Sequence, residues 1–182
     1  LHLCVRDLEN INIKKKIDND NLLADVCLAA KYEGDLIKTH YTPYQQKYGI
    51  TDSEICTMLA RSFADIGDII RGKDLYRGVN GNDKLENKLK EIFKKIHGGL
   101  TTKKGAKDHY KDGSGDFFQL REDWWNNNRE MVWYAITCGA GGGTYFRPTC
   151  GVGRDAIRTP NQCRCGSYKV PTYFDYVPQF LR

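Results

Sequence analysis

Cysteine and glycine gather towards the end of the chain, and this cluster constrains the fold more than any other sequence feature. Four of the seven cysteines (Cys138, Cys150, Cys163 and Cys165) lie beside or within residues 139–170, which also hold seven glycines. No helical or strand period of apolar residues runs through this segment, so regular secondary structure is not expected to hold it in place. We predict a loop-rich lobe that disulfides fasten to the rest of the protein.

Seven cysteines in 182 residues indicate an oxidising, extracellular compartment, because cytosolic thiols stay reduced. The number is odd, and we expect that Cys4 has lost a partner upstream. A chain that begins at Leu1 without an initiator Met or a leader is expected to be a fragment or a processed product. The six cysteines other than Cys4 are expected to pair among themselves, and fifteen connectivities remain open. These disulfide candidates are Cys27, Cys56, Cys138, Cys150, Cys163 and Cys165.

A zinc site is the alternative use of these cysteines. Only one residue separates Cys163 from Cys165, whereas structural zinc sites usually space paired cysteines by about two to four residues. We therefore expect disulfides and no metal. The glycine-rich stretches 139–143 and 151–153 do not follow a strand, so a nucleotide-binding loop is not expected, and we predict no cofactor.

Four stretches repeat apolar residues at helical spacing, which predicts an all-α bundle joined to the disulfide-bonded lobe. The first begins at Asp20 or Asn21 and is expected to break at Pro43 and Gly49, because a proline inside a helix removes a backbone hydrogen bond. A short helix is also expected to start near Pro178.

The other three stretches have clear ends. A capping box over residues 51–54 begins the second helix, and Gly72 closes it. Asp83 is expected to cap the third, which ends at residues 98–99. The fourth runs from about residue 116 to residue 138, where we expect Trp124 in the core and Trp125 half-buried, because adjacent helical positions point in different directions.

Positive charge is concentrated between residues 84 and 111. This window holds nine lysines against Glu86, Glu91 and Asp108, a net charge of +6, while the whole chain carries +5. A basic helix face that continues into a basic loop favours a polyanionic partner. The extracellular compartment favours a sulfated glycan over nucleic acid. The candidate glycan contacts are Lys88, Lys95, Lys103, Lys104, Lys107 and Lys111.

The alternative is an ordinary solvated helix face, on which Glu86 would pair with Lys90 and Glu91 with Lys95. No catalytic motif accompanies the charge, and the four histidines are scattered, so we predict that the chain is not an enzyme. No apolar stretch approaches the ~18 residues that a membrane-spanning helix needs.

Long, specific motifs are spread along the chain. They are LHLC (1–4), LLADVCLAAKYEG (22–34), LARSFADIGDIIRGKDLY (59–76), WWNNNREMVWYAITC (124–138), QCRC (162–165) and VPTYFDYVPQFL (170–181). Together they resemble the signature of the Duffy-binding-like domain, in the alpha type that occurs in the malarial erythrocyte membrane protein 1 adhesins. The resemblance covers essentially the whole chain.

The resemblance implies a helical domain of three cysteine-linked subdomains without catalysis. Residues 1–19 would be the tail of the first subdomain and residues 20–182 most of the second, with the third absent from this chain. In related invasion ligands a cysteine in the position of Cys56 bonds one near the end of the subdomain, which here would be Cys163 or Cys165. The lysine window lies between the family motifs, so the resemblance assigns it no role.

The resemblance also implies a function at the cell surface. Such domains are displayed on the extracellular face of the infected erythrocyte as part of a larger membrane-anchored protein, and act in cytoadhesion and rosetting. The implied partners are a host cell-surface receptor or a sulfated glycan such as heparan sulfate, and a neighbouring cysteine-rich domain of the same protein. The competing hypothesis is a structural module that positions that neighbour and has no ligand of its own.

Overall fold

The chain folds into a helical bundle with an attached loop-rich lobe. The computed structural model describes residues 8, 9, 11, 18–49, 53–75, 84–100, 105–145, 147–166 and 169–182, with the side chains of 42–48 excepted. Over these ranges the only β pairing is two isolated bridges, so the predicted all-α fold is confirmed. The helices are α2 (Asn19–Tyr48), α3 (Ser53–Arg71), α4 (Lys84–Gly99), α5 (Ala106–His109) and α6 (Phe118–Ile136), followed by the 3₁₀ turns η1 (Gly153–Asp155), η2 (Phe174–Tyr176) and η3 (Gln179–Leu181).

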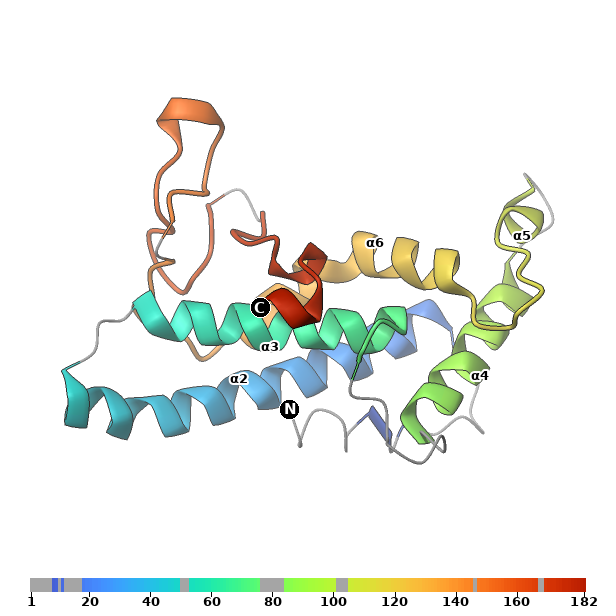
Figure 1. Cartoon of the computed structure of the whole chain (residues 1–182), viewed down its shortest axis with the longest axis horizontal. Helices are drawn as coiled ribbons and strands as arrows, with labels where there is room; N and C mark the ends of the chain where they lie inside the picture. Colours follow the sequence, from blue (N-terminus) through green and yellow to red (C-terminus); the bar gives the residue numbers. More distant parts are fainter. Residues whose placement is uncertain are drawn as a thin grey trace.

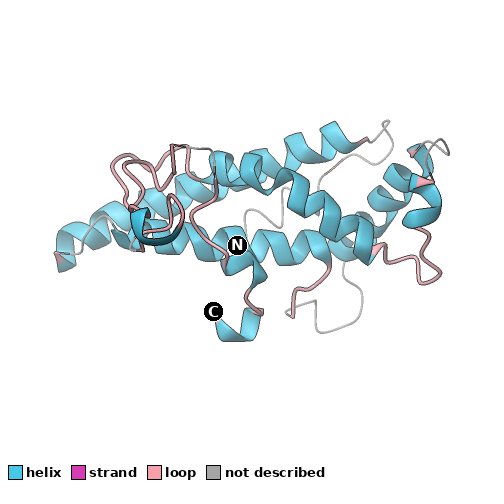
Figure 2. Ribbon diagram, turned by 90° about the horizontal axis from the view of Figure 1, so that it is seen from above, coloured by secondary structure: helices cyan, strands magenta, loops and turns pink. Residues whose placement is uncertain are grey.

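Three long helices, α2, α3 and α6, lie side by side, and α3 runs opposite to the other two (Figures 1 and 2). Aromatic rings fill the space between α3 and α6: the ring of Phe63 lies 5.1 Å from that of Trp125 and 5.2 Å from that of Trp133. Tilted and edge-on ring pairs of this kind add to the burial of large apolar surfaces. Helix α4 crosses one end of the bundle, where Phe93 meets Trp124 edge-on.

Helices α2 and α6 come into backbone contact at Gly34. A Cβ at this position would lie 2.0 Å from the carbonyl oxygen of Ile136, so only glycine allows the two helices to approach this closely. The adjacent Glu33 is buried and accepts a hydrogen bond from the hydroxyl of Ser62 on α3. The glycine that interrupts the apolar pattern of α2 is therefore a contact point for α6.

The predicted end of α3 agrees with the structure. The helix stops at Arg71, and Gly72 adopts a left-handed φ of 71°, the conformation in which glycine ends helices. Helix α4 ends at Gly99, also as predicted. The capping hydroxyl of Thr51 and the cap at Asp83 lie outside the described residues.

Three local predictions were wrong. Helix α2 continues through Pro43 to Tyr48, so the predicted break at Pro43 was wrong, whereas the break at Gly49 agrees with its left-handed φ of 65°; a proline removes one backbone hydrogen bond and can kink a helix without ending it. Trp125 is fully buried, because it packs against Phe63 and Gly67 of α3 and the C-terminal segment adds Asp175, which accepts a hydrogen bond from its N–H. The expected helix after Pro178 is only the 3₁₀ turn η3.

Candidate functional site

Two disulfides hold the loop-rich lobe (residues 139–170). Cys56 of α3 bonds Cys163, and Cys150 bonds Cys165 within the lobe. The partners are 107 and 15 residues apart in sequence, and loop-closure entropy assigns about 4.7 kcal/mol to a loop of ~100 residues and about 3 kcal/mol to one of ~15. Gly143 packs on the first bond, since a Cβ there would lie 2.8 Å from the sulfur of Cys163.

The prediction that all six candidate cysteines pair differs from the structure. Cys27 and Cys138 form no disulfide among the described residues, and Cys4 lies outside them. Gly139, next to Cys138, faces Asp35 of α2, which lies about 12 Å along the helix from Cys27 at ~1.5 Å per residue. A disulfide spans a Cα separation of at most about 7 Å, so Cys27 and Cys138 lie too far apart to bond each other. Burial raises the pKa of the Cys27 thiol, which favours its protonated form.

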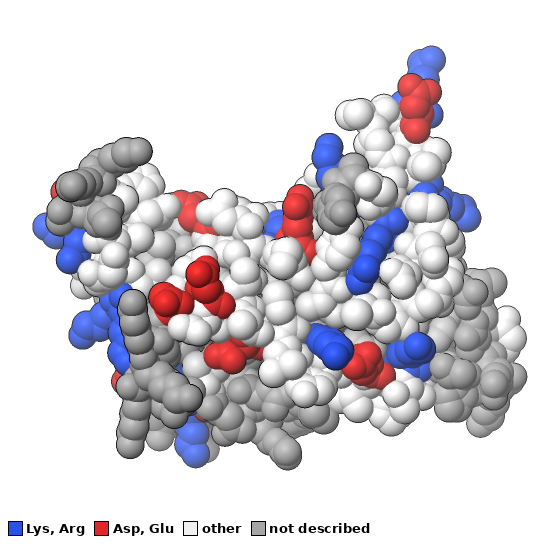
Figure 3. All heavy atoms as spheres, turned by 180° about the vertical axis from the view of Figure 1, so that it is seen from behind, with Lys and Arg blue, Asp and Glu red and all other residues white. Residues whose placement is uncertain are grey.

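The lysine window forms an outward basic surface on α4 and α5. On α4 the apolar residues Leu85, Leu89, Ile92, Phe93 and Ile96 turn inward, while Lys84, Lys94 and Lys95 are exposed. Lys107 of α5 is half-buried and Lys111 is exposed; Lys103 and Lys104 lie outside the described residues. We call Lys84, Lys94, Lys95, Lys107 and Lys111 the basic surface. Figure 3 shows lysine and arginine side chains gathered at the end of the molecule that carries α4.

Two lysines of the window are held by other parts of the protein. The ammonium of Lys88 donates to the backbone carbonyl of Glu9 at 2.5 Å, so this candidate contact is turned towards the N-terminal segment. Lys90 pairs with Asp116 at 2.6 Å, and the hydrogen bond from Lys90 lowers the pKa of that carboxyl. Neither lysine is therefore placed in the basic surface.

The expected pairing of Glu86 with Lys90 was wrong. The carboxylate of Glu86 turns inward and accepts two hydrogen bonds from the guanidinium of Arg121, at 2.7 and 2.9 Å. A bidentate contact with a buried guanidinium is stronger than a pairing with a solvated lysine on the same helix. Because Glu86 no longer faces solvent, Glu91 is the acidic residue of α4 that remains on its outward face.

A hollow of about 360 Å³ lies beside the basic surface. It is lined by His109, Tyr110, Lys111, Asp112, Gly113, Phe117, Phe118, Gln119 and Leu120. The carboxylate of Asp112 accepts bonds from the hydroxyl and N–H of Ser114 and from the N–H of Phe117, and these bonds hold the pKa of Asp112 below its usual range. A bond between a ring nitrogen of His97 and the carbonyl of Lys107 joins α5 to α4.

The C-terminal segment is fixed to the bundle by buried charges. Arg129 of α6 forms two hydrogen bonds to the buried carboxylate of Asp175, at 2.7 and 2.8 Å, and Trp125 donates a third at 2.9 Å. Arg71 of α3 bonds Asp68 at 3.0 Å and the backbone carbonyl of Asp175. This network could not be predicted from the sequence, because its members are scattered over more than 100 residues and their charges look like ordinary surface charges.

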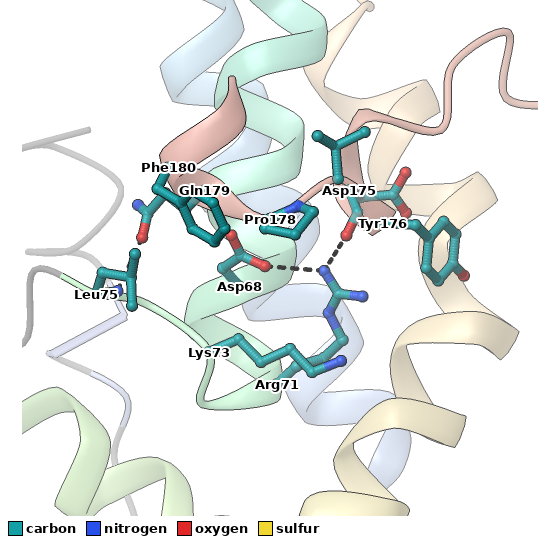
Figure 4. A pocket seen from close by; sticks show the side chains of 10 residues that line it. Asp68, Arg71, Lys73, Leu75, Asp175, Tyr176, Pro178, Gln179 and Phe180 are labelled. Atoms are coloured by element: carbon teal, nitrogen blue, oxygen red, sulfur yellow. Dashed lines mark hydrogen bonds and ion pairs between the residues drawn. The ribbon is translucent and has the colours of Figure 1, made fainter.

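A cavity of about 240 Å³ opens above this network (Figure 4). Asp68, Arg71 and Lys73 from the α3 end and Asp175 to Phe180 from the C-terminal segment line it. The cationic groups that line it are already paired: the buried Arg71 and the exposed Lys73 both bind Glu122, at 3.2 and 2.5 Å. Its rim is apolar and exposed, with Leu75, Tyr176 and Phe180 open to solvent.

The described part of the chain gives no sign of a metal site or a membrane span. No group of three or more histidine, cysteine or acidic side chains there is arranged to hold a metal ion. None of the helices is long and apolar enough to cross a bilayer. What the described surface offers is an outward cationic patch, a hollow beside it, and an apolar rim around the cavity, which suit binding of another molecule.

Comparison with known proteins assigns the chain to a family. The sequence matches the Duffy binding domain family over residues 1–182, and the chain belongs to that family, which is one of adhesion domains without enzymatic activity. Among curated proteins it is 28% identical over 142 residues to the beta form of the Duffy receptor of Plasmodium knowlesi, covering 73% of this chain and 10% of that protein.

The solved structures place the chain nearer to one branch of the family. It is 40% identical to the NTS-DBL1(alpha-1) domain of the Plasmodium falciparum membrane protein 1 of the varO strain, with a TM-score of 0.82 over 99% of this chain and 40% of that one. A DBLb domain of PfEMP1 bound to human ICAM-1 is 31% identical, with a TM-score of 0.64 over 98% of this chain and 36% of that one. The chain thus spans well under half of each of these relatives.

Proposed function

We propose that the chain is part of an extracellular adhesion domain that binds a host cell-surface receptor from the surface of an infected erythrocyte. The observation that carries this proposal is family membership over residues 1–182, together with 40% identity to a PfEMP1 domain. A relative of 31% identity is described in complex with human ICAM-1, which supports receptor binding as the kind of activity. Cytoadhesion and rosetting follow as the cellular roles of this proposal.

The proposal includes a division of the chain. Residues 1–19 would belong to a first subdomain and residues 20–182 to a second. The start of α2 at Asn19 supports a boundary there. A neighbouring cysteine-rich domain is the expected companion, since a similar structure contains NTS-DBL1-alpha together with a CIDR-gamma domain.

As the ligand chemistry of the basic surface we propose a sulfated glycan. The lysines of the basic surface outnumber the acidic residues beside them, since Glu86 is turned inward to Arg121 and leaves Glu91, Asp108 and Asp112. A polyanion gains affinity from such a surface by releasing its counterions. Nucleic acid has the same charge but is disfavoured by the two disulfides, which are typical of oxidising compartments.

Salt-dependent elution from immobilised heparin tests this contact. The double variant Lys107→Ala/Lys111→Ala is compared with Lys31→Ala/Lys169→Ala, which removes the same charge from exposed lysines outside the window. We expect the first to elute at lower salt and to reduce the slope of log affinity against log salt by roughly 1.5, as two lost ionic contacts would. The control should elute like wild type. If both variants elute at equally lowered salt, the effect is one of overall charge, and the proposed glycan contact is refuted.

A second candidate function is a structural module that positions a neighbouring domain. The observation that favours it is the apolar rim of the 240 Å³ cavity, where Leu75 and Phe180 are 63% and 74% exposed. Protease cleavage between the two domains, followed in a tandem protein that carries Phe180→Ser, tests this role. Faster cleavage than in wild type would support it, and an unchanged rate would oppose it.

A further inference from the structure

A short hairpin of residues 150–157 projects from the loop-rich lobe. Its two ends, Cys150 and Ile157, exchange both backbone hydrogen bonds, at 2.8 and 2.9 Å. Its turn depends on glycine, because Gly151 and Gly153 have φ angles of 119° and 62°, which other residues rarely adopt. Figure 1 shows this segment standing away from the helices, and Figure 3 shows the same projection from behind with charged side chains towards its tip.

The base of the hairpin is firmly held. Cys150 is bonded to Cys165, and the buried hydroxyl of Thr159 accepts a 2.6 Å hydrogen bond from the N–H of Tyr145. Arg164 ties the lobe to the end of α6 by donating to the hydroxyl of Thr137 and the carbonyl of Tyr134, at 2.7 and 2.6 Å. A loop that is ordered before binding loses less conformational entropy when it docks.

The hairpin presents two apolar side chains to solvent, Val152 next to its turn and Ile157 at its base. Val152 is 86% exposed, more than any other large apolar residue described, and Ile157 is 62% exposed. At this exposure Val152 contributes almost no burial to the fold. An apolar side chain on a projection that is fixed at its base can be buried only when another molecule binds over it.

The charge of the hairpin and of the residue that follows it is net positive. Arg154 is exposed beside the acidic Asp155 in the turn, and Arg158 is exposed directly after Ile157. Arginine at the edge of an apolar contact pairs well with carboxylates, which it can bind through two hydrogen bonds. The complementary surface is therefore an apolar pocket with an acidic border.

We propose that the 150–157 hairpin docks on a host cell-surface protein by inserting Val152 into an apolar pocket bordered by acidic residues. This contact rests on the proposed adhesion function and is separate from the basic surface of α4 and α5. A sulfated glycan would satisfy the arginines but has no apolar pocket for Val152. The valine thus points to a protein partner.

Binding of the purified, oxidised chain to intact erythrocytes tests the proposal. The variants are Val152→Ser, the conservative Val152→Ile, and Met131→Ser as the control, which makes a similar change at a 58% exposed apolar residue of α6. The cells are used untreated, trypsin-treated or heparin lyase-treated. Because Val152 is almost fully exposed, its substitution is expected to leave the melting temperature unchanged, which is measured alongside.

We expect Val152→Ser to weaken binding about tenfold, equal to ~1.4 kcal/mol, while Val152→Ile and Met131→Ser bind like wild type. The part of the binding that depends on Val152 should disappear after trypsin and survive heparin lyase. If Val152→Ser binds as tightly as wild type, or its defect persists on trypsin-treated cells, the docking contact is refuted while adhesion stands. If wild type binds no cells, both the contact and the proposed adhesion function fail.

Discussion

The guanidinium of Arg121 and the carboxylate of Glu86 form a buried pair that joins three helices. Arg121 belongs to α6 and is fully buried, Glu86 belongs to α4, and the two share hydrogen bonds of 2.7 and 2.9 Å. Arg121 also donates to the carbonyls of Ile70 and Ile69 at the end of α3, at 2.6 and 3.0 Å. A cation at a helix C-terminus satisfies carbonyls that lack partners within the helix.

Removal of Arg121 should therefore be costly. In Arg121→Ala the carboxylate of Glu86 and the two carbonyls lose their donor inside the protein, and we expect about 3–5 kcal/mol of lost stability. Arg61→Ala, which removes an exposed arginine of α3, should change stability by no more than about 0.5 kcal/mol. Urea unfolding followed by tryptophan fluorescence measures both. A similar small effect for the two variants would contradict the role assigned to the pair.

The disulfide between Cys56 and Cys163 should stabilise the whole chain. The double variant Cys56→Ser/Cys163→Ser releases the lobe from α3, and we expect a loss of about 2–5 kcal/mol. Cys138→Ser is the matched control, because Cys138 is exposed and forms no disulfide among the described residues. Thermal unfolding with and without reductant measures the difference. If reductant lowers the melting temperature of the double variant as much as that of wild type, the Cys56–Cys163 disulfide is not the bond that stabilises the chain.

The close approach of α2 to α6 makes Gly34 sensitive to a single methyl group. Gly34→Ala would place a Cβ 2.0 Å from the carbonyl oxygen of Ile136, and we expect at least about 1–3 kcal/mol of destabilisation as the helices separate. Gly98→Ala meets open space on α4 and should be neutral or stabilising by up to about 1 kcal/mol. Opposite signs for the two variants in urea unfolding would support the contact, and a neutral Gly34→Ala would oppose it.

The loop between α5 and α6 should show acid-dependent stability. Hydrogen bonds from Ser114 and Phe117 lower the pKa of Asp112 in the folded protein, so the unfolded chain binds a proton more readily than the folded one. The stabilisation is then complete above the ordinary aspartate pKa of about 3.9 and is lost as the pH falls through the lower folded value. Melting temperatures of wild type and Asp112→Asn, measured from neutral pH into this acid range, should converge as the pH falls. A gap that stays constant would contradict the lowered pKa.

The strongly amphipathic helices could be predicted from the sequence because their burial depends on local spacing. The stripes of α3 and α4 placed Ile66, Ile70 and Leu89 in the core, where the structure has them fully buried. The loop-rich lobe could likewise be predicted from its cysteines and glycines. The cysteine count left fifteen connectivities open, and the pairing of Cys56 with Cys163 or Cys165 came from the family resemblance.

What escaped prediction depends on residues far apart in the chain. Trp125 is buried because Phe63 of α3 and Asp175 of the C-terminal segment pack against it, and Glu86 turns inward because Arg121 reaches it from α6. Local rules assign Glu86 to a lysine on its own helix and treat Trp125 as half-exposed. Only part of the candidate site could be predicted from the sequence. The outward lysines of α4 were expected, while the hydrogen bond from Lys88 to the backbone carbonyl of Glu9 was not.

The most direct test of the account is the binding of the oxidised chain to host cells. Fluorescently labelled chain is titrated onto erythrocytes and onto cells that bear heparan sulfate, and bound fluorescence is measured by flow cytometry. The account predicts saturable binding that soluble heparin reduces and that is lost when the chain is reduced and alkylated. Fluorescence that never saturates, or that equals the signal of the reduced and alkylated chain, would contradict it.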